Sequence, residues 1–431
     1  MKKIAFKTLG CRLNLYETDA LASKLAGANY QVVNFNQKAD IYVINTCTVT
    51  NQSDQKSRQA ISQSNRINPD GLTIVTGCMA TNYKKDLEGN DTIDYVVDNN
   101  HKTSIPCLLD AHFKGETVSP DQFESNVFNF AAADETFHTR SFIKVQDGCD
   151  NFCTFCIVPK VRGRAVSRPP KDIFENIRQV VAFGFKEVVI TGVNIGRYQS
   201  GEYDFEKLVK SILEIPGDFK VRISSIEPDG FRDSFFKLFK HPKLTPHLHL
   251  CLQSGSEDIL LQMRRMYSAS EFEKVALKLK SDYPNFNLTT DIIVGFPGET
   301  AEDFQQTIDI TNKIGFGHAH TFKYSVRSGT RAEMLPDQIP EKVKTNRSEI
   351  IRKLVDENKL AYRKSFIGQN QRVLIEKINK GGFASGYGEN YVPVIIHQKG
   401  LEKNTFCDVV IESVQSGEEP ILIGKIKQPP A

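Results

Sequence analysis

Residues 146–164 read QDGCDNFCTFCIVPKVRGR and place three cysteines close together, at Cys149, Cys153 and Cys156. Thiolates at this spacing are typical of a metal centre, but three of them leave a tetrahedral site or a four-iron cubane one protein ligand short. A structural zinc site normally closes with a fourth Cys or His. A [4Fe–4S] cluster held by three thiolates instead keeps one iron free for a substrate or cofactor. The run therefore indicates reaction chemistry more than structural support.

The cysteine run directly follows the first of six predicted strands in the middle of the chain. Amphipathic helices separate several of these strands, and Ile173, Ile177, Val180 and Val181 form one clear apolar stripe. Six β/α units are too few for a closed eight-stranded barrel, so we predict an open, partial (β/α)6 barrel over residues 135–364. The cysteines then lie at the C-terminal mouth, where such barrels build their active sites. The strand candidates are SFIKVQDG (141–148), EVVITGVNIG (187–196), VRISSIEP (221–228), LHLCLQSGS (248–256), LTTDIIVGFPGE (288–299) and AHTFKYSVRSGT (319–330).

The first part of the chain repeats one pattern three times. KIAFKTLGC, DIYVINTC and LTIVTGC are apolar runs that end at Cys11, Cys47 and Cys78. Helical patterns follow the first two, and Ser53 is a plausible N-cap of the second helix. Alternating strands and helices predict a doubly wound parallel sheet over residues 1–115, with all three cysteines at one edge. A single cysteine in such a place is usually a small core residue, but three equivalent placements favour a second three-cysteine cluster.

The other segments carry less information. Residues 116–134 form a predicted linker that packs on the first domain through Val127, Phe128 and Phe130. Residues 365–428 contain short β-rich runs and predict a small all-β unit. In its first loop, Tyr387 and Tyr391 could stack on bases or pack the barrel rim, and rim packing is slightly favoured. We expect the other cysteines, Cys107, Cys251 and Cys407, to serve packing alone.

Polar residues and glycines at the other strand ends are candidates for holding a cofactor beside Cys149, Cys153 and Cys156. Each has a structural alternative, such as a solvated strand end for Glu227 or a structural amide for Gln253. The turn GFPGET, which begins at Gly295, permits close backbone approach but is weak evidence alone. The candidates are Asn194, Glu227, Gln253, Ser254, Gly295 and Lys323.

These features together resemble the radical S-adenosylmethionine (SAM) methylthiotransferases. The resemblance covers almost the whole chain and lies in TLGCRLN, INTCTVT, TGCMA, QDGCDNFCTFCIVP, RISSIEP, LQSGS and TTDIIVGFPGET. It implies an enzyme with two [4Fe–4S] clusters: one on Cys149, Cys153 and Cys156 that binds SAM, and an auxiliary one on Cys11, Cys47 and Cys78. It also implies an external electron donor, a sulfur source and, for the C-terminal unit, an RNA-binding TRAM-like barrel.

The family has branches that modify isopentenyladenosine in tRNA, N6-threonylcarbamoyladenosine in tRNA, or an aspartate of a ribosomal protein. TLGCRLN and VRGRAVSRP resemble the threonylcarbamoyladenosine branch, because the other two typically have Gln-Met-Asn or Pro-Lys-Asn after the first cysteine. That substrate carries a carboxylate, which arginine binds well. Arg162, Arg164 and Arg168 beyond the cysteine run are therefore candidate substrate contacts, with a solvated basic loop as the alternative.

Composition is compatible with this interpretation. The chain has 55 basic and 52 acidic residues, so contacts with nucleic acid must come from local patches. We expect no membrane-spanning segment, and nine cysteines with no disulfide pattern favour a reducing cytoplasmic location. An alternative from a different class is a non-catalytic RNA-binding protein in which the metal serves structure alone.

Overall fold

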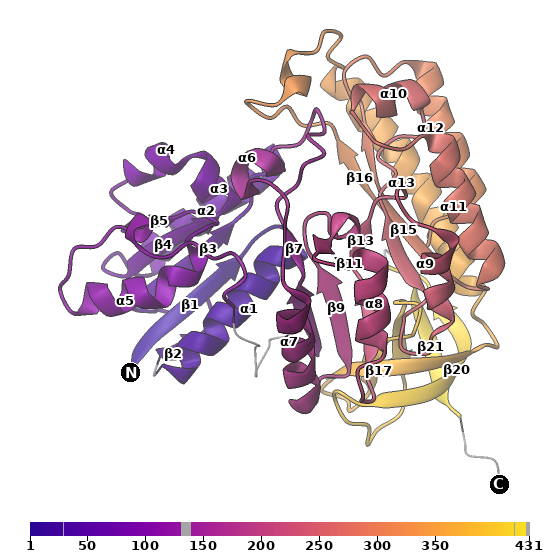
Figure 1. Cartoon of the computed structure of the whole chain (residues 1–431). Coiled ribbons are helices and arrows are strands. Elements are labelled where there is room, and N and C mark those ends of the chain that lie inside the picture. The colour runs from indigo at the N-terminus through magenta and orange to yellow at the C-terminus, as the bar shows by residue number, and fades with distance from the viewer. Residues whose placement is uncertain (29, 131–138, 418, 428–431) are drawn as a thin grey trace.

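The computed structural model describes residues 1–28, 30–130, 139–417 and 419–427. Its helices and strands form three neighbouring parts, with the N-terminal sheet beside the central strands and the C-terminal barrel at one end of those strands (Figure 1). The predicted linker, 116–134, lies partly outside the described residues. The predicted domain limits at residues 135 and 428 lie outside them altogether.

The N-terminal part is a five-stranded parallel sheet in the order β2-β1-β3-β4-β5. Every residue of β3 and β4 is buried, because helices cover both faces of the sheet. Helices α1 and α5 pack on one face, and α2 and α3 pack on the other. The strands are β1 (Lys2–Thr8), β2 (Tyr30–Val33), β3 (Ile41–Thr46), β4 (Leu72–Gly77) and β5 (Tyr95–Val97), and the helices are α1 (Arg12–Gly27), α2 (Asn51–Ile67), α3 (Cys78–Asn82), α4 (Lys84–Glu88) and α5 (Ile105–Phe113).

Helix α2 begins three residues earlier than the sequence predicted. Thr50 is its N-cap, and the Thr50 hydroxyl accepts a hydrogen bond of 3.1 Å from the backbone N–H of Ser53. The prediction of Ser53 as the cap was therefore wrong. Both residues are of the capping type, and the choice depends on where the chain leaves β3.

The central part contains all six predicted strands, and every pair of bonded neighbours among them is parallel. The predicted strand at 221–228 is divided into β12 and β13, so seven strands form the sheet β12-β9-β6 and the sheet β13-β14-β15-β16. Val221 of β12 also bridges to Leu244, in the segment before β14. The strands are β6 (Arg140–Lys144), β9 (Glu187–Thr191), β12 (Lys220–Ile223), β13 (Ser225–Ile226), β14 (His247–Leu250), β15 (Asn287–Val294) and β16 (His318–Lys323).

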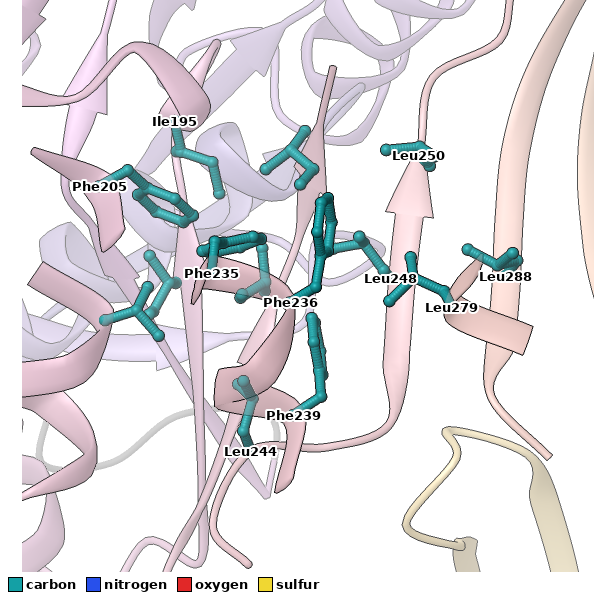
Figure 2. Close-up of a cluster of buried hydrophobic side chains, with 14 of the residues drawn as sticks. Ile195, Phe205, Phe235, Phe236, Phe239, Leu244, Leu248, Leu250, Leu279 and Leu288 are labelled. Carbon is teal, nitrogen blue, oxygen red and sulfur yellow. The ribbon is translucent and has the colours of Figure 1, made fainter. Parts of the chain in front are cut away.

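Helices pack on these strands around a large apolar core. Ile173, Ile177 and Val180 of α7 are fully buried, as their spacing predicted. Figure 2 shows Phe235 and Phe236 of α9 inside this core, near Leu248 of β14. The short helix α9 spans Asp233–Lys237, and the longer helices are α7 (Pro170–Ala182), α8 (Phe205–Leu213), α11 (Ala269–Asp282), α12 (Ala301–Ile314) and α13 (Glu341–Lys364).

The C-terminal strands close into a barrel in the order β17-β18-β19-β21-β20, which confirms the predicted all-β barrel. Tyr387 and Tyr391 stack on each other at 4.7 Å between ring centroids, and the guanidinium of Arg140 lies 4.6 Å from the Tyr387 ring. Both rings therefore pack between the barrel and β6, which is the favoured alternative. The strands are β17 (Asn370–Ile378), β18 (Ala384–Tyr387), β19 (Pro393–Ile396), β20 (Phe406–Gln415) and β21 (Ile421–Ile426).

A buried group of five charged side chains joins the N-terminal sheet to the central strands. Glu17 of α1 accepts from Lys144 at 2.9 Å and from Arg162 at 3.1 Å, and it also pairs with Lys102. Asp147 pairs with Lys144 at 2.5 Å and with Arg162 at 3.0 Å. The side chains of all five are at most 3 % exposed. We call these five residues the junction cluster.

The junction cluster holds its carboxylates in the charged form. Burial by itself would raise the pKa of Glu17, but Arg162, Lys102 and Lys144 together hold that pKa well below its usual range. In Lys102 burial has the larger effect and lowers the pKa of the ammonium group. Each charge therefore depends on its partners, and removing one leaves the others buried without compensation.

We predict that Glu17→Gln destabilises the protein by about 3 kcal/mol or more, the usual cost of breaking a buried ion pair. Denaturant unfolding of the purified protein measures this loss. The matched control is Glu202→Gln, which removes an exposed pair with Lys207 and should cost less than about 1 kcal/mol. Equal losses in the two variants would contradict the stabilising role of the junction cluster.

The same variant tests pH dependence. The pKa of Glu17 is lower in the folded protein than its unfolded value of about 4.3. Its contribution to stability is therefore complete above that pH and is lost as the pH falls towards the folded pKa. When the pH is lowered from about 7 to about 3, the free energy of unfolding should therefore fall less in Glu17→Gln than in the wild type.

Candidate active site

The three N-terminal cysteines lie at the carboxyl ends of neighbouring parallel strands. Cys11 follows β1 as the N-cap of α1, Cys47 follows β3 directly, and Cys78 follows β4 as the first residue of α3. Because β1, β3 and β4 are adjacent, their ends meet at one edge of the sheet, as the sequence predicted. Cys47 and Cys78 are buried and Cys11 is exposed. We call these three residues the N-terminal trio.

The backbone around the N-terminal trio has little free space. Gly10 has a φ of +91°, and a Cβ at this position would lie 2.6 Å from the Cys47 Cβ and 2.7 Å from its Sγ. The side-chain amide of Asn99 donates to Cys78 Sγ at 3.5 Å and to the Val161 carbonyl at 2.8 Å. Burial, with Cys78 and Cys11 adding to it, raises the pKa of the Cys47 thiol to about 11. A thiolate here therefore needs positive charge beside it, which a metal centre supplies.

The second trio, Cys149, Cys153 and Cys156, lies in the loop between β7 (Gln146–Asp147) and α6 (Val158–Arg162). The Cys149 N–H donates to the Gly163 carbonyl at 3.2 Å, and the Cys156 N–H donates to the Cys153 carbonyl at 3.0 Å. The loop thus folds back on itself and places the three thiols on one compact turn. We call these three residues the loop trio.

Two polar side chains contact the loop trio, Asn194 from the end of β9 and Arg265 from the segment before α11. Arg265 donates to Cys153 Sγ at 3.2 Å, and the amide of Asn194 lies 3.8 Å from Cys149 Sγ. Burial, only partly offset by Arg265, raises the pKa of Cys153, and burial raises that of Cys156 to about 12. As at the N-terminal trio, these thiolates need a compensating cation.

The spacing of the sulfur atoms argues against a single metal ion. Among the described residues, the ligand-atom trios that lie within 4.8 Å of one another are His249–Cys251–Asp291 and Asp98–His101–Asp121, and neither cysteine trio is among them. A tetrahedral zinc, with Zn–S bonds of about 2.3 Å, needs its sulfurs closer than this. Wider spacing suits a multinuclear iron–sulfur cluster, so the residues present fit that group.

A cavity of about 1110 Å³ connects the edge of the N-terminal sheet with the ends of the central strands. Cys11 and Cys47 line it on one side, and His249, Asp291 and His320 line it from β14, β15 and β16. His249 Nε2 lies 3.4 Å from Asp291 Oδ2. Burial tends to raise the pKa of Asp291, but the hydrogen bond from His249 and the positive charges nearby lower it overall. The cavity can hold a ligand between the two parts of the molecule.

The predicted cofactor contacts separate into two groups. Asn194 lies beside Cys149, and Glu227 accepts from Asn151 at 2.6 Å and pairs with Arg265 at 2.9 Å, so both belong to the surroundings of the loop trio. Lys323 lines the cavity and pairs with Glu341.

The remaining candidates have structural contacts. Gln253 has a φ of +67° and bridges to Ile292 of β15, and Ser254 is buried against Thr307 of α12. A Cβ on Gly295 would lie 2.4 Å from Cγ of Lys344. These contacts give Ser254 and Gly295 structural roles, and the cofactor contact of the Gln253 side chain stays a prediction.

The arginine predictions need correction. Arg162 is buried in the junction cluster and donates to Glu17, Asp147 and Asn14. Arg168 is also buried and donates to Asn176 at 2.9 Å. Neither guanidinium is available to a substrate, because each is already bound inside the protein. Arg164 has a 73 % exposed side chain and pairs with Asp150.

Sequence reasoning missed Arg265, Arg12 and the histidines of the cavity. His249 lies in β14 and His320 lies in β16. The alternation of side chains along a strand was the available signal, because it places each histidine on the face opposite its apolar neighbours. Arg265 lies beyond the strand-end motif LQSGS, and its contact with Cys153 joins residues 112 positions apart. Arg12 is part of the motif TLGCRLN, but no contact was predicted for it.

Two family models match the chain. Residues 3–98 match the Uncharacterized protein family UPF0004, and residues 143–310 match the Radical SAM superfamily. A solved structure of the radical SAM methyltransferase TsrM from Kitasatospora setae has a TM-score of 0.56 at 13 % identity, over 75 % of this chain and 72 % of that one. This similarity supports the α/β radical-SAM fold of the central part.

Curated relatives match nearly the whole chain. The threonylcarbamoyladenosine tRNA methylthiotransferase MtaB of Thermotoga maritima is 38 % identical over 91 % of both chains, and that of Bacillus subtilis is 37 % identical over 97 % of this chain and 95 % of the relative. The tRNA-2-methylthio-N(6)-dimethylallyladenosine synthase of Ehrlichia canis is 34 % identical over 89 % of this chain and 90 % of the relative. The chain therefore belongs to the radical-SAM methylthiotransferases, enzymes that use SAM and two [4Fe–4S] clusters.

Proposed function

We propose that this protein transfers a methylthio group to C2 of N6-threonylcarbamoyladenosine at position 37 of tRNA, next to the anticodon. The cavity that has Cys11 and Cys47 in one wall and strand ends in the other carries this proposal, because it gives the base a place beside the N-terminal trio and at the carboxyl ends of the central strands. The choice of base rests on the MtaB relatives, at 37–38 % identity against 34 % for the dimethylallyladenosine enzyme. A ribosomal-protein aspartate remains the less supported alternative.

We assign the loop trio to the cluster that binds SAM and the N-terminal trio to the auxiliary cluster. When bound, SAM and the first cluster supply a radical that removes hydrogen from an unactivated carbon, and the auxiliary cluster supplies the sulfur. Arg265 donates to Cys153 and so stabilises negative charge on the loop trio. Asn194 and Glu227, which lie beside the same loop, are our candidates for contacts with SAM.

The partner is tRNA, and we propose two surfaces for it. The C-terminal barrel resembles a TRAM domain, and the exposed side of α13 carries Lys342, Arg352, Lys353 and Lys364. Basic side chains on one helix face can contact phosphates. Tyr387 and Tyr391 are not candidates for stacking on bases, because arginine side chains and each other already cover their rings.

The reaction requires an external electron donor and a sulfur source, which we propose as further partners in the cytoplasm. Among the described residues, no helix is long and apolar enough to cross a membrane.

We predict that the anaerobically reconstituted protein binds about eight irons and about eight sulfides, as two cubanes require. Cys153→Ala should lose about half of both and should stop cleaving SAM, because the loop trio then has two thiolates. Iron and sulfide analysis, with SAM cleavage followed by chromatography, measures these effects. A wild-type content of about four irons or fewer would contradict the assignment of two cubanes.

A glycine pair provides a matched test of the N-terminal trio. Gly10→Ala should lose iron from this trio while SAM cleavage persists, because a Cβ would collide with Cys47. Gly27→Ala is the control, since nothing lies within 4 Å of its added Cβ. Equal iron content in the two variants would show that Gly10 is not needed around the cluster.

We predict that tRNA from a strain lacking this gene contains threonylcarbamoyladenosine but no 2-methylthio derivative of it. Mass spectrometry of digested nucleosides measures both. Re-expression of the wild type should restore the derivative, and Cys11→Ala should not. Loss of methylthio-isopentenyladenosine alone would assign the protein to the other tRNA branch.

A further inference from the structure

Three arginines whose charges interact belong to β6, β12 and α1, and two of them have carboxylate partners. Arg140 pairs with Glu187 at 3.0 Å and also with Glu376. Arg222, which is 1 % exposed, pairs with the other oxygen of Glu187 at 2.6 Å. The third arginine is Arg12, whose charge interacts with both of the others.

Arg12 has no such partner. Among the residues that the structure describes, it makes no hydrogen bond and no ion pair, although burial and then Arg222 lower the pKa of its guanidinium. Arg12 lines the large cavity next to Cys11. The cavity carboxylate Asp291 is already bound to His249. A guanidinium without a counterion at a concave surface is suited to an anionic ligand.

A second unpartnered polar group lies in the same wall. Ser224 is 3 % exposed, lines the cavity, and its Oγ has no hydrogen-bond partner. It stands two residues after Arg222, between β12 and β13, and it lines the same cavity as Arg12. Buried hydroxyl groups are normally satisfied, so this one indicates a ligand that completes it.

We propose that Arg12, assisted by Ser224, binds the carboxylate of the threonylcarbamoyl group and so selects this base over isopentenyladenosine. The inference rests on the proposed function. In adenine, C2 and the carbon that bears N6 flank the same ring nitrogen, so a group on N6 lies close to the reacting carbon. Arg12 is adjacent to Cys11, which belongs to the trio assigned to the sulfur-bearing cluster. An isopentenyl group would leave the guanidinium unpaired in the cavity, which penalises the wrong substrate.

The test measures binding by the full-length reconstituted protein to anticodon stem-loop RNAs. The RNAs carry threonylcarbamoyladenosine, its methyl ester, isopentenyladenosine or unmodified adenosine at position 37. We expect the wild type to bind the free acid about 10- to 100-fold more tightly than the ester, the range for charge-assisted hydrogen bonds. In Arg12→Gln this ratio should fall to about one, and Arg12→Lys should recover part of it.

The ratio distinguishes a recognition role from a folding defect, because misfolding or cluster loss weakens binding of the acid and the ester alike. Arg178→Gln is the matched control: it removes an exposed arginine of α7 and should leave the ratio unchanged. Ser224→Ala should lower the ratio by a smaller factor than Arg12→Gln.

Four outcomes would overturn the inference. An unchanged acid-to-ester ratio in Arg12→Gln excludes Arg12 as the carboxylate contact. If Arg12→Gln binds SAM more weakly while the ratio is unchanged, Arg12 contacts the carboxylate of SAM. If Arg12→Gln loses as much affinity for the unmodified RNA as for the free acid, Arg12 contacts a phosphate. A wild type that prefers isopentenyladenosine RNA to the free acid would instead defeat the proposed function, and with it the inference.

Discussion

The relative placement of the two cysteine trios depends on the junction cluster. Glu17 lies in the helix that Cys11 begins, Asp147 comes two residues before Cys149, and Arg162 ends the helix that follows Cys156. Arg162 joins both carboxylates within 3.1 Å in an interior that solvent does not reach. A shift of either part would separate charges that cannot be solvated where they are. The ion network is therefore a geometric constraint on the catalytic centre as well as an element of stability.

Such a constraint suits a reaction that needs two metal centres and a base in one arrangement. Small displacements of reacting groups reduce rates strongly, so the supporting contacts matter as much as the ligands. Asn99 continues the same connection, because its amide contacts Cys78 Sγ on one side and the carbonyl of Val161 on the other. The cavity between the two parts is bounded by elements that these buried contacts hold.

The sequence predicted what local patterns determine. Apolar runs that end in cysteine placed Cys11, Cys47 and Cys78 at adjacent strand ends, because parallel strands align their carboxyl ends. It could not predict the partners of Arg162, since Glu17 lies 145 residues away and an arginine in a basic loop looks solvated. The roles of Arg12 and Arg265 were hidden for the same reason. Whether a guanidinium is paired depends on the tertiary structure, whereas strand periodicity is visible in a few consecutive residues.

The exposure of Cys11 has a chemical consequence for the holoenzyme. Of the six cysteines assigned to metal, Cys11 alone is exposed, while its partners Cys47 and Cys78 are buried. Oxidation of thiols follows their access to solvent and their thiolate character. Before the cluster is in place, oxidation of the N-terminal trio therefore starts at Cys11, so a protein oxidised there cannot complete the auxiliary centre of the holoenzyme and is unable to deliver sulfur.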